Sequence, residues 1–260
     1  MDCYYKNTTQ FQLKEPPKRI ISLVPSLTEL LFELGLGPQI VGRTKFCIHP
    51  EPAVKAIPVI GGTKNLRFDT ITALQPDLII ANSEENRKED VTTLKEQFPV
   101  AVTTIYDLPS AYAEILELAS ITDTSAQANT LITTIKNGFA QLNGKSATPK
   151  KVLYLIWQKP YMSIGGDTFI SALLQEAGFR NVMQAQQRYP TLTEAELVQT
   201  DAELLFLSSE PYPFKQKELE ALQVLLPTKK IILVDGEFFS WYGSRLQHAP
   251  LYFKQLYDQI

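Results

Sequence analysis

Residues 19–30, RIISLVPSLTEL, decide the fold. The first half of this stretch is a short β-branched apolar run, which favours a buried strand. Pro25 follows, and Ser26 and Glu29 stand at the spacing of a capping box, which predicts the start of a helix. Leucines at three- and four-residue steps give this helix one apolar face, and Gly35 is well placed for a left-handed C-terminal cap.

The same pattern returns in the second half of the chain. Residues 151–156, KVLYLI, repeat the first strand, and a helix capped by Asp167 and ending at Gly178 repeats the helix that ends at Gly35. Further strands are predicted at 77–81, 100–104 and 230–234, and further helices at 68–74, 86–98, 108–119, 215–225 and 248–257. Strands that alternate with helices predict parallel sheets covered on both faces.

A long amphipathic segment separates the two halves. Residues 123–142 repeat apolar side chains at three- and four-residue steps, which predicts one helix of roughly 28 Å at 1.5 Å per residue. The polar stretch 143–149 then ends the connection. We therefore predict an α/β protein with two Rossmann-like lobes, each around a central parallel sheet, joined by one long α-helix with a ligand cleft between the lobes.

The predicted boundaries are an N-terminal lobe at residues 1–122, a connecting helix and linker at 123–149, and a C-terminal lobe at 150–260. Weak alternation from Tyr4 to Leu13 predicts a short hairpin or edge strand before the first lobe.

Composition and motifs exclude several classes of protein. The net charge of −3 and the lack of a Lys/Arg stripe argue against nucleic-acid binding. The Gly-Gly pairs fit neither nucleotide-phosphate motif. Cys3 and Cys47 show no CxxC spacing, and whether they form a bridge stays open. No stretch approaches the roughly 18 apolar residues of a membrane helix, so direct membrane insertion is not expected.

Catalytic and metal-centred functions also lack their usual residues. His49 and His248 are the only histidines, which excludes a three-histidine metal site, and no GxSxG elbow supports a Ser-His-Asp triad. We predict no catalytic residues and no metal held by the protein itself. For His49, an axial bond to a chelated metal and a surface or capping role both stay open.

Ligands of open parallel sheets bind at the carboxyl ends of strands, so the loops after the strands are the candidate site. The loop at residues 235–245 joins Trp241 and Tyr242 to Arg245, a combination that suits a flat, partly anionic ligand. Trp157 and Tyr161 lie at the matching strand end of the same half. Phe238 and Phe239 fit either a pocket or packing of the last helix.

These residues resemble those of the periplasmic solute-binding proteins of iron-siderophore and vitamin B12 ABC importers, over Lys18 to Ile260. The most specific stretches are 19–30, 59–62 with 71–80, and 165–178. The resemblance implies lobes that move little around a helical backbone and hold the ligand between them.

The resemblance also implies one acidic residue on each lobe that docks onto the membrane permease. The first position falls on Asp69. The second falls on Ala195, so its flanking residues Glu194 and Glu196 are the candidates.

The loop pattern is similar to that of cobalamin-binding members, with Phe46, His49, Trp157, Tyr161, Trp241, Tyr242 and Arg245 as the predicted ligand contacts. A tryptophan carried just before Asn65 by the best-known cobalamin binders is absent, so a ferric siderophore or haem stays open. The expected ligand is a corrinoid or iron chelate, with no intrinsic cofactor.

The resemblance implies a periplasmic monomer that is not an enzyme and whose partner is an ABC importer permease. The N-terminus shows no basic or apolar export signal, so either the start is incomplete or the protein stays in the cytoplasm. The second hypothesis is therefore an intracellular enzyme or sensor that handles a tetrapyrrole or metal chelate.

Overall fold

The computed structural model describes residues 13–142 and 148–260. Cys3, nearly all of the hairpin predicted at residues 4–13, and residues 143–147 of the predicted linker lie outside the described residues. The chain divides into two compact units: unit 1 comprises residues up to 105, 109–134 and 242–245, and unit 2 comprises 106–108, 135–241 and 246–260. Within the described ranges, no helix has the length and apolarity to cross a bilayer.

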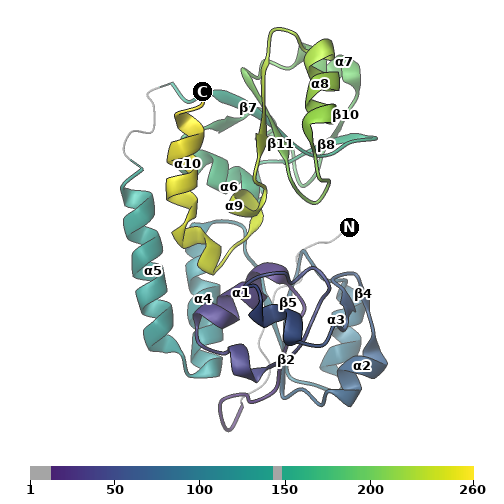
Figure 1. The fold of residues 1–260 in the computed structure, drawn as a ribbon, viewed down its shortest axis with the longest axis vertical. Helices are drawn as coiled ribbons and strands as arrows, with labels where there is room; N and C mark the ends of the chain where they lie inside the picture. The colour runs from purple at the N-terminus through teal and green to yellow at the C-terminus, as the bar shows by residue number, and fades with distance from the viewer. Residues whose placement is uncertain (1–12, 143–147) are drawn as a thin grey trace. The chain divides into compact units, whose positions relative to one another are not determined.

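Unit 1 is built on a parallel sheet of order β2-β1-β5-β6, of which β2 and β5 are labelled in Figure 1. Its strands are β1 (Ile20–Ser22), β2 (Ile40–Arg43), β5 (Leu78–Asn82) and β6 (Val100–Thr103). Its helices are α1 (Pro25–Glu33), α2 (Phe68–Ala73), α3 (Lys88–Lys95) and α4 (Leu108–Thr122), with short 3-10 turns η1 (Gly37–Gln39) and η2 (Ala53–Ala56). A small antiparallel hairpin joins β3 (Gly61–Gly62) to β4 (Asn65–Leu66). The predicted parallel α/β architecture is thus confirmed for this half.

The start of helix α1 differs from the prediction. Val24 is the N-cap and makes no side-chain cap, and Pro25 occupies the first helical position. Proline suits this position because its fixed φ is already helical and it has no N–H to leave unpaired. The predicted capping box of Ser26 and Glu29 is therefore wrong. The C-terminal cap is confirmed, since Gly35 has φ +84°.

Unit 2 contains a mixed sheet of order β10-β8-β7-β11-β12, with β9 beside the start of β7. Strands β7 (Lys151–Trp157), β9 (Arg180–Asn181), β11 (Leu204–Ser208) and β12 (Lys230–Val234) are parallel, whereas β8 (Tyr161–Ser163) and β10 (Thr191–Leu192) are antiparallel. The prediction of a parallel sheet is therefore wrong for β8, which pairs antiparallel with both β7 and β10. Three residues separate β7 from β8, too few for the crossover that a parallel neighbour needs.

The two faces of the unit 2 sheet carry different side chains. Leu153 and Leu205 lie opposite each other on one face and join an aliphatic cluster with residues of α7 (Glu194–Gln199) and α8 (Gln216–Leu225). Tyr154 and Phe206 face the other way, where Phe239 packs 5.3 Å from Tyr154 between ring centroids. Phe239 belongs to α9 (Glu237–Ser240), so it packs in the core.

Helix α6 (Phe169–Glu176) repeats α1 and ends at Gly178, which has φ +84° like Gly35. The N-cap is Thr168, whose Oγ1 accepts from the backbone N–H of Ser171 at 3.2 Å. The predicted cap by Asp167 is therefore wrong. The carboxylate of Asp167 instead accepts a hydrogen bond from the backbone N–H of Arg188 at 2.6 Å.

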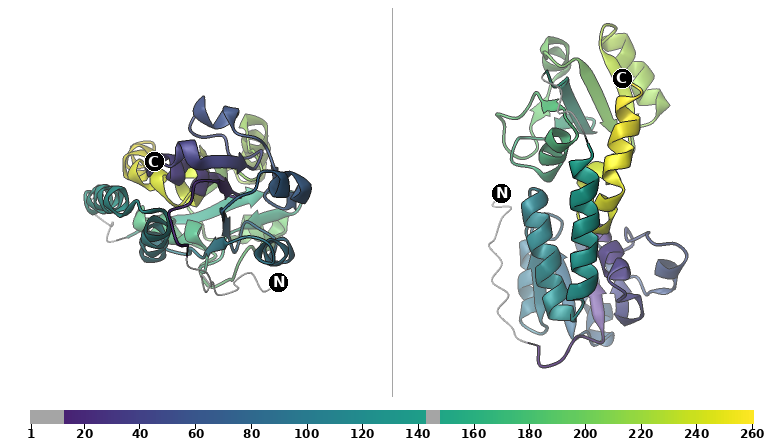
Figure 2. Two further views of the ribbon diagram at one scale, coloured as in Figure 1. Left: turned by 90° about the horizontal axis from the view of Figure 1, so that it is seen from below. Right: turned by 90° about the vertical axis from the view of Figure 1, so that its left-hand side faces the viewer.

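The predicted connecting helix is α5 (Ser125–Ala140), a single helix of about 24 Å at 1.5 Å per residue. It begins two residues late because Asp123 has φ +57°, which separates it from α4. The end of α5 runs beside α10 (Ala249–Tyr257), where Gly138 lies against Pro250 (Figure 2). The two units meet within α5 at residues 134 and 135. The predicted lobe boundaries and the ligand cleft stay predictions.

Candidate functional site

In unit 1, the loop after β2 carries the exposed ring of Phe46. The guanidinium of Arg43 donates to the carbonyl oxygens of Val54 at 2.7 Å and of Cys47 at 3.1 Å, which fixes the loop at both ends. Phe46 is 49% exposed, and His49, three residues later, is partly buried on the same loop. An aromatic ring held in the open at the carboxyl end of a parallel strand is placed where a ligand would contact it.

The ring of Phe46 rests on the β3–β4 hairpin. A Cβ built on Gly62 would lie 3.3 Å from Cε2 of Phe46, so the ring approaches the bare backbone closely. The ammonium of Lys45 lies 4.9 Å from the centroid of the same ring. The edge of unit 1 near β2 is therefore aromatic and cationic.

The buried thiol of Cys47 lies below this loop. It is a free cysteine whose Sγ contacts the hydroxyls of Thr28 at 3.0 Å and Thr44 at 3.1 Å, and burial raises its pKa. Cys3, whose pairing with Cys47 the sequence leaves open, lies outside the described residues.

Two asparagines shape the loop that follows β5. The side-chain oxygen of Asn82 accepts from the backbone N–H groups of Glu84 at 2.9 Å and Glu85 at 3.2 Å. Asn86 is buried, accepts from the backbone N–H of Asn82 at 2.9 Å and donates to the carbonyl of Thr63 at 3.0 Å. Residues 82–86 therefore form a hydrogen-bonded loop before α3.

Residues 242–245 belong to unit 1 although they follow β12 and α9 in the chain. Arg245 donates to both carboxylate oxygens of Glu29 on α1, at 2.6 and 3.1 Å. Gly243, with φ +107°, lets the backbone pass close to α1, since a Cβ there would lie 3.2 Å from the Cβ of Leu30. Tyr242 is buried beside this segment. The predicted cation of the site is thus bound to a carboxylate that sequence reasoning assigned to a cap.

Carboxylates gather around Tyr242 at the edge of unit 1. Burial and the charges of Glu85, Glu84 and Glu114 raise the pKa of the Tyr242 hydroxyl well above its usual range. Glu114, on α4, accepts from the backbone N–H of Thr104 at 2.7 Å. This edge near β5 and β6 is therefore acidic, in contrast to the edge near β2.

Burial raises the pKa of Glu114 to about 7 from its usual 4.5, with a further increase from the charge of Glu117. The folded protein thus binds this proton more tightly than the unfolded chain, so stability is full below about pH 4.5 and falls as the pH rises towards about 7. Because the side chain is partly solvated, we expect a loss of about 1–2 kcal/mol.

Glu114→Gln keeps the oxygen that accepts from Thr104 and removes the titration. We expect the variant to be more stable than the wild type at pH 8 by about 1–2 kcal/mol and equal to it near pH 4.5, in urea unfolding. Glu117→Gln, at an exposed position on the same helix, is the control and should change the profile less. A Glu114→Gln profile parallel to that of the wild type would contradict this assignment.

In unit 2, Trp157 ends β7 and is 40% exposed. Its ring meets that of Tyr212 edge to face, with centroids 5.6 Å apart, and the side chain of Gln158 donates to the Tyr212 hydroxyl. Tyr161 begins β8 and packs partly against the aliphatic cluster, and burial raises its pKa. Trp157 and Tyr161 therefore lie on one β-hairpin, which the sequence, interpreted here as a loop after a strand, did not predict.

Trp241 is only 6% exposed. Its indole Nε1 donates to Oε1 of Glu210 at 3.0 Å, and the Ser240 hydroxyl donates to the same oxygen. The indole therefore belongs to a buried polar cluster at the carboxyl end of β11. Any ligand contact of Trp241 involves the small part of its surface that remains open.

The three predicted docking residues stand at the first turns of two short helices. Asp69 is exposed at the second position of α2, and Ala195 occupies the same position of α7. Glu196 is engaged in a capping box, since its carboxylate accepts from the Thr193 backbone N–H at 2.7 Å. Glu194 is exposed at the first position of α7. Asp69, Glu194 and Glu196 all stay predicted docking residues.

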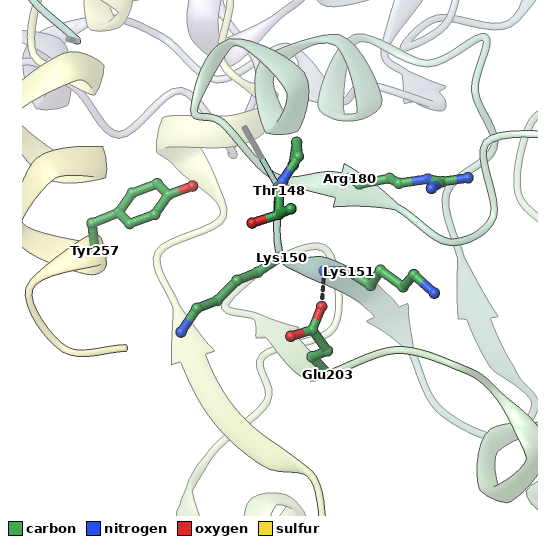
Figure 3. Close-up of a pocket in the computed structure, with 7 residues that line it drawn as sticks. Thr148, Lys150, Lys151, Arg180, Glu203 and Tyr257 are labelled. Carbon is green, nitrogen blue, oxygen red and sulfur yellow. Dashed lines mark hydrogen bonds between the residues drawn. The ribbon is translucent and has the colours of Figure 1, made fainter. Parts of the chain in front are cut away.

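A cavity of about 550 Å³ lies at the opposite, amino end of the unit 2 strands (Figure 3). It is lined by Thr148, Pro149, Lys150, Lys151, Arg180, Glu203 and Tyr257. Ligand sites of this size are mostly apolar, and those of parallel sheets lie at the carboxyl ends of the strands.

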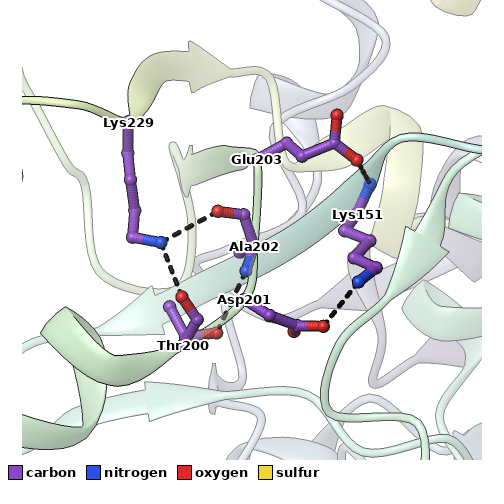
Figure 4. A network of polar contacts seen from close by, with 6 residues as sticks. All are labelled: Lys151, Thr200, Asp201, Ala202, Glu203 and Lys229. Atoms are coloured by element: carbon purple, nitrogen blue, oxygen red, sulfur yellow. Dashed lines mark hydrogen bonds and ion pairs between the residues drawn. The ribbon is translucent and has the colours of Figure 1, made fainter.

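The charged side chains beside this cavity form ion pairs and hydrogen bonds with other groups of the protein. The Lys151 ammonium lies 2.7 Å from the Asp201 carboxylate, and its backbone N–H donates to Glu203 at 3.0 Å. Lys229 donates to the carbonyls of Thr200 at 2.7 Å and Ala202 at 2.9 Å (Figure 4). We interpret this end of the sheet as structural.

The structure thus brings together Phe46 with His49, Tyr242 with Arg245, and Trp157 with Tyr161, and holds Trp241 on Glu210. Glu29, Glu114 and Glu210 were missed by sequence reasoning because each acts on a residue distant in the chain. Among the described residues, no group of three or more His, Cys, Asp and Glu side chains is placed to hold a metal ion.

Comparisons with known proteins agree with this architecture. The vitamin B12-binding protein of Vibrio parahaemolyticus is 26% identical over 198 residues, which cover 75% of this chain and 72% of that protein. The crystal structure of the periplasmic vitamin B12-binding protein BtuF of Vibrio cholerae aligns with a TM-score of 0.77 at 20% identity, covering 94% of this chain and 99% of the other.

The periplasmic haem-binding protein RhuT from Roseiflexus sp. RS-1 also aligns with a TM-score of 0.77 at 20% identity, over 92% of this chain and 98% of the other. These structures share the fold. A family model described as periplasmic binding protein matches residues 20–226, most of the chain. The protein therefore belongs to the periplasmic binding protein family.

Proposed function

We propose that this chain is the solute-binding component of an ABC importer and that its ligand is a corrinoid. The observation that carries the proposal is the pair of exposed aromatic rings, Phe46 and Trp157, each at the carboxyl end of a parallel strand in its own unit. Exposed rings fixed at strand ends suit a large, flat, partly apolar ligand, since their faces remove apolar surface from water. No bond has to be made or broken for this role.

Each unit carries its own candidate residues for contact with the ligand. Unit 1 offers Phe46 and His49 on one loop and the segment that begins at Tyr242, and unit 2 offers Trp157 and Tyr161. Arg245 contributes by holding that segment on α1 through Glu29.

The vitamin B12-binding relative supports a corrinoid as the ligand, and an acidic edge around Tyr242 suits the amide N–H groups of a corrin better than the carboxylates of haem or of an anionic siderophore. The proposed location is outside the cytoplasmic membrane, with an importer permease as the partner of a monomer. Haem and a ferric siderophore are the competing ligands in the same role.

Isothermal titration with cyanocobalamin, haemin and ferrichrome distinguishes these ligands. We expect cyanocobalamin to bind with a Kd well below 10 μM, which corresponds to about −7 kcal/mol, and the other two to bind more weakly. Tight binding of haemin or ferrichrome alone would replace the corrinoid by that chelate. Absence of binding below about 10 μM by all three would remove the proposal, and turnover of a bound chelate would favour an enzyme.

Trp157→Ala tests the ring in unit 2. We expect it to weaken cyanocobalamin binding by about 1–3 kcal/mol, because an aromatic anchor at a binding site carries energy of this order. Val224→Ala, which also shortens an exposed apolar side chain but on α8, is the control and should leave the affinity unchanged. Equal affinities of the two variants would remove Trp157 from the site.

A further inference from the structure

Residues of the loop after β11 contact both tryptophans of the chain. Glu210 accepts a hydrogen bond from the indole of Trp241 at 3.0 Å, and Tyr212, two residues later, packs edge to face on Trp157. Phe214 then continues the row of rings, 4.8 Å from Tyr212 between centroids. The segment 210–214 therefore contacts both indoles of unit 2, the buried indole of Trp241 and the exposed indole of Trp157.

We propose that Glu210 is a positioning residue that sets the orientation of the Trp241 indole and, through it, the ligand affinity of unit 2. This inference rests on the proposed function for its second part. A carboxylate is the natural partner of an indole, because indole N–H only donates and a carboxylate only accepts. Such a charge-assisted bond in a mostly buried place is stronger than one between neutral groups.

The surroundings of Glu210 are built around this carboxylate. The Ser240 hydroxyl donates to the same oxygen as Trp241, and the Ser208 hydroxyl donates to the Glu210 carbonyl at 2.6 Å. Gly236 allows the approach, since a Cβ there would lie 2.8 Å from Cγ of Glu210 and 2.3 Å from Oγ of Ser208. The side chain therefore has little freedom to leave the indole.

The charged groups that face Glu210 are acidic. Burial raises its pKa, and the carboxylates of Glu237 and Asp235, on the segment after β12, raise it further, against the hydrogen bonds from Ser240 and Trp241. Tyr154, on β7, lies close enough for the Glu210 charge to raise the pKa of its hydroxyl. The pKa of Glu210 is therefore raised, and the charge beside the indole changes as this carboxyl titrates.

The indole part is tested by fluorescence in a Trp157→Phe background, where Trp241 is the only tryptophan left. We expect Glu210→Ala to shift the emission of Trp241 and Glu210→Gln, which keeps an acceptor oxygen, to retain the emission of the parent. The parent emission should change as Glu210 titrates, and that of Glu210→Gln should not. Glu220→Ala, the same change at an exposed position on α8, is the control and should resemble the parent.

The proposed effect of Glu210 on ligand affinity is tested by calorimetry with cyanocobalamin, in the protein that keeps Trp157. We expect Glu210→Ala to lower the affinity about tenfold and Glu210→Gln to stay within about threefold of the wild type. In a Trp241→Phe background, which has no indole N–H, Glu210→Ala should lower the affinity much less.

The outcomes separate this inference from the proposed function. If Glu210→Ala leaves the Trp241 emission unchanged, or lowers the affinity equally with and without the indole, the positioning role is overturned. If the wild type binds none of the chelates, the proposed function fails, and the affinity part of this inference fails with it. The emission data still decide whether Glu210 sets the environment of Trp241.

Discussion

Arg245→Met is expected to lower the stability of unit 1 by about 3 kcal/mol. The guanidinium makes two hydrogen bonds to Glu29, at 2.6 and 3.1 Å, and both side chains are largely buried. Removing the arginine leaves a carboxylate without its cation in a place that water reaches poorly, which costs more than the pair itself contributes. Urea unfolding followed by circular dichroism measures the loss.

The control for this prediction is the double variant Glu29→Met with Arg245→Met. It removes both charges and keeps two apolar side chains of similar length, so we expect it to recover to within about 1 kcal/mol of the wild type. Both tryptophans belong to unit 2, so a loss confined to unit 1 should appear more in circular dichroism than in tryptophan emission. If Arg245→Met keeps the stability of the wild type and binds the ligand more weakly, Arg245 contacts the ligand instead.

Gly61→Ala is expected to lower stability by about 3–4 kcal/mol. Gly61 has φ +115°, a conformation that side chains rarely adopt, and a Cβ there would lie 2.3 Å from the carbonyl oxygen of Asn65. The hairpin therefore has to open to accept the methyl group. Because Phe46 rests on the neighbouring Gly62, we also expect weaker binding of cyanocobalamin.

Gly35→Ala is the matched control for Gly61→Ala. Gly35 also has a positive φ, +84°, but a Cβ there would meet no atom within 4 Å. Its cost should therefore be that of the left-handed backbone alone, about 1–2 kcal/mol. Thermal unfolding of the two variants separates strain from collision. Equal losses of stability in the two variants would mean that the hairpin accommodates the added methyl group without a steric clash.

Local patterns predicted much of the fold because the signals lie within a few residues of the structure they determine. The strand, proline and helix of residues 19–35 and the long helix near 123–142 follow from apolar spacing and from the glycine that ends a helix. The antiparallel strand β8 was missed because Pro160 and its neighbours were interpreted only as a loop.

The candidate site depends on contacts between distant parts of the chain, which spacing does not encode. Glu29 and Arg245 are 216 residues apart, so the capping pattern around Ser26 was the nearer explanation for Glu29. Trp241 lies in a predicted loop with a glycine on each side, which favours an exposed ring, but Glu210 accepts its N–H and holds it in a buried place. Such pairings become visible only when the fold is known.

The placement of residues 242–245 bears on how the protein can be divided. A fragment that ends at residue 134 would contain every strand of unit 1 and still leave Glu29 without Arg245 and Leu30 without its contact with Gly243. Unit 1 is therefore completed only after residues 242–245 have been synthesised. During translation, its final contacts have to wait for the C-terminal half to emerge from the ribosome.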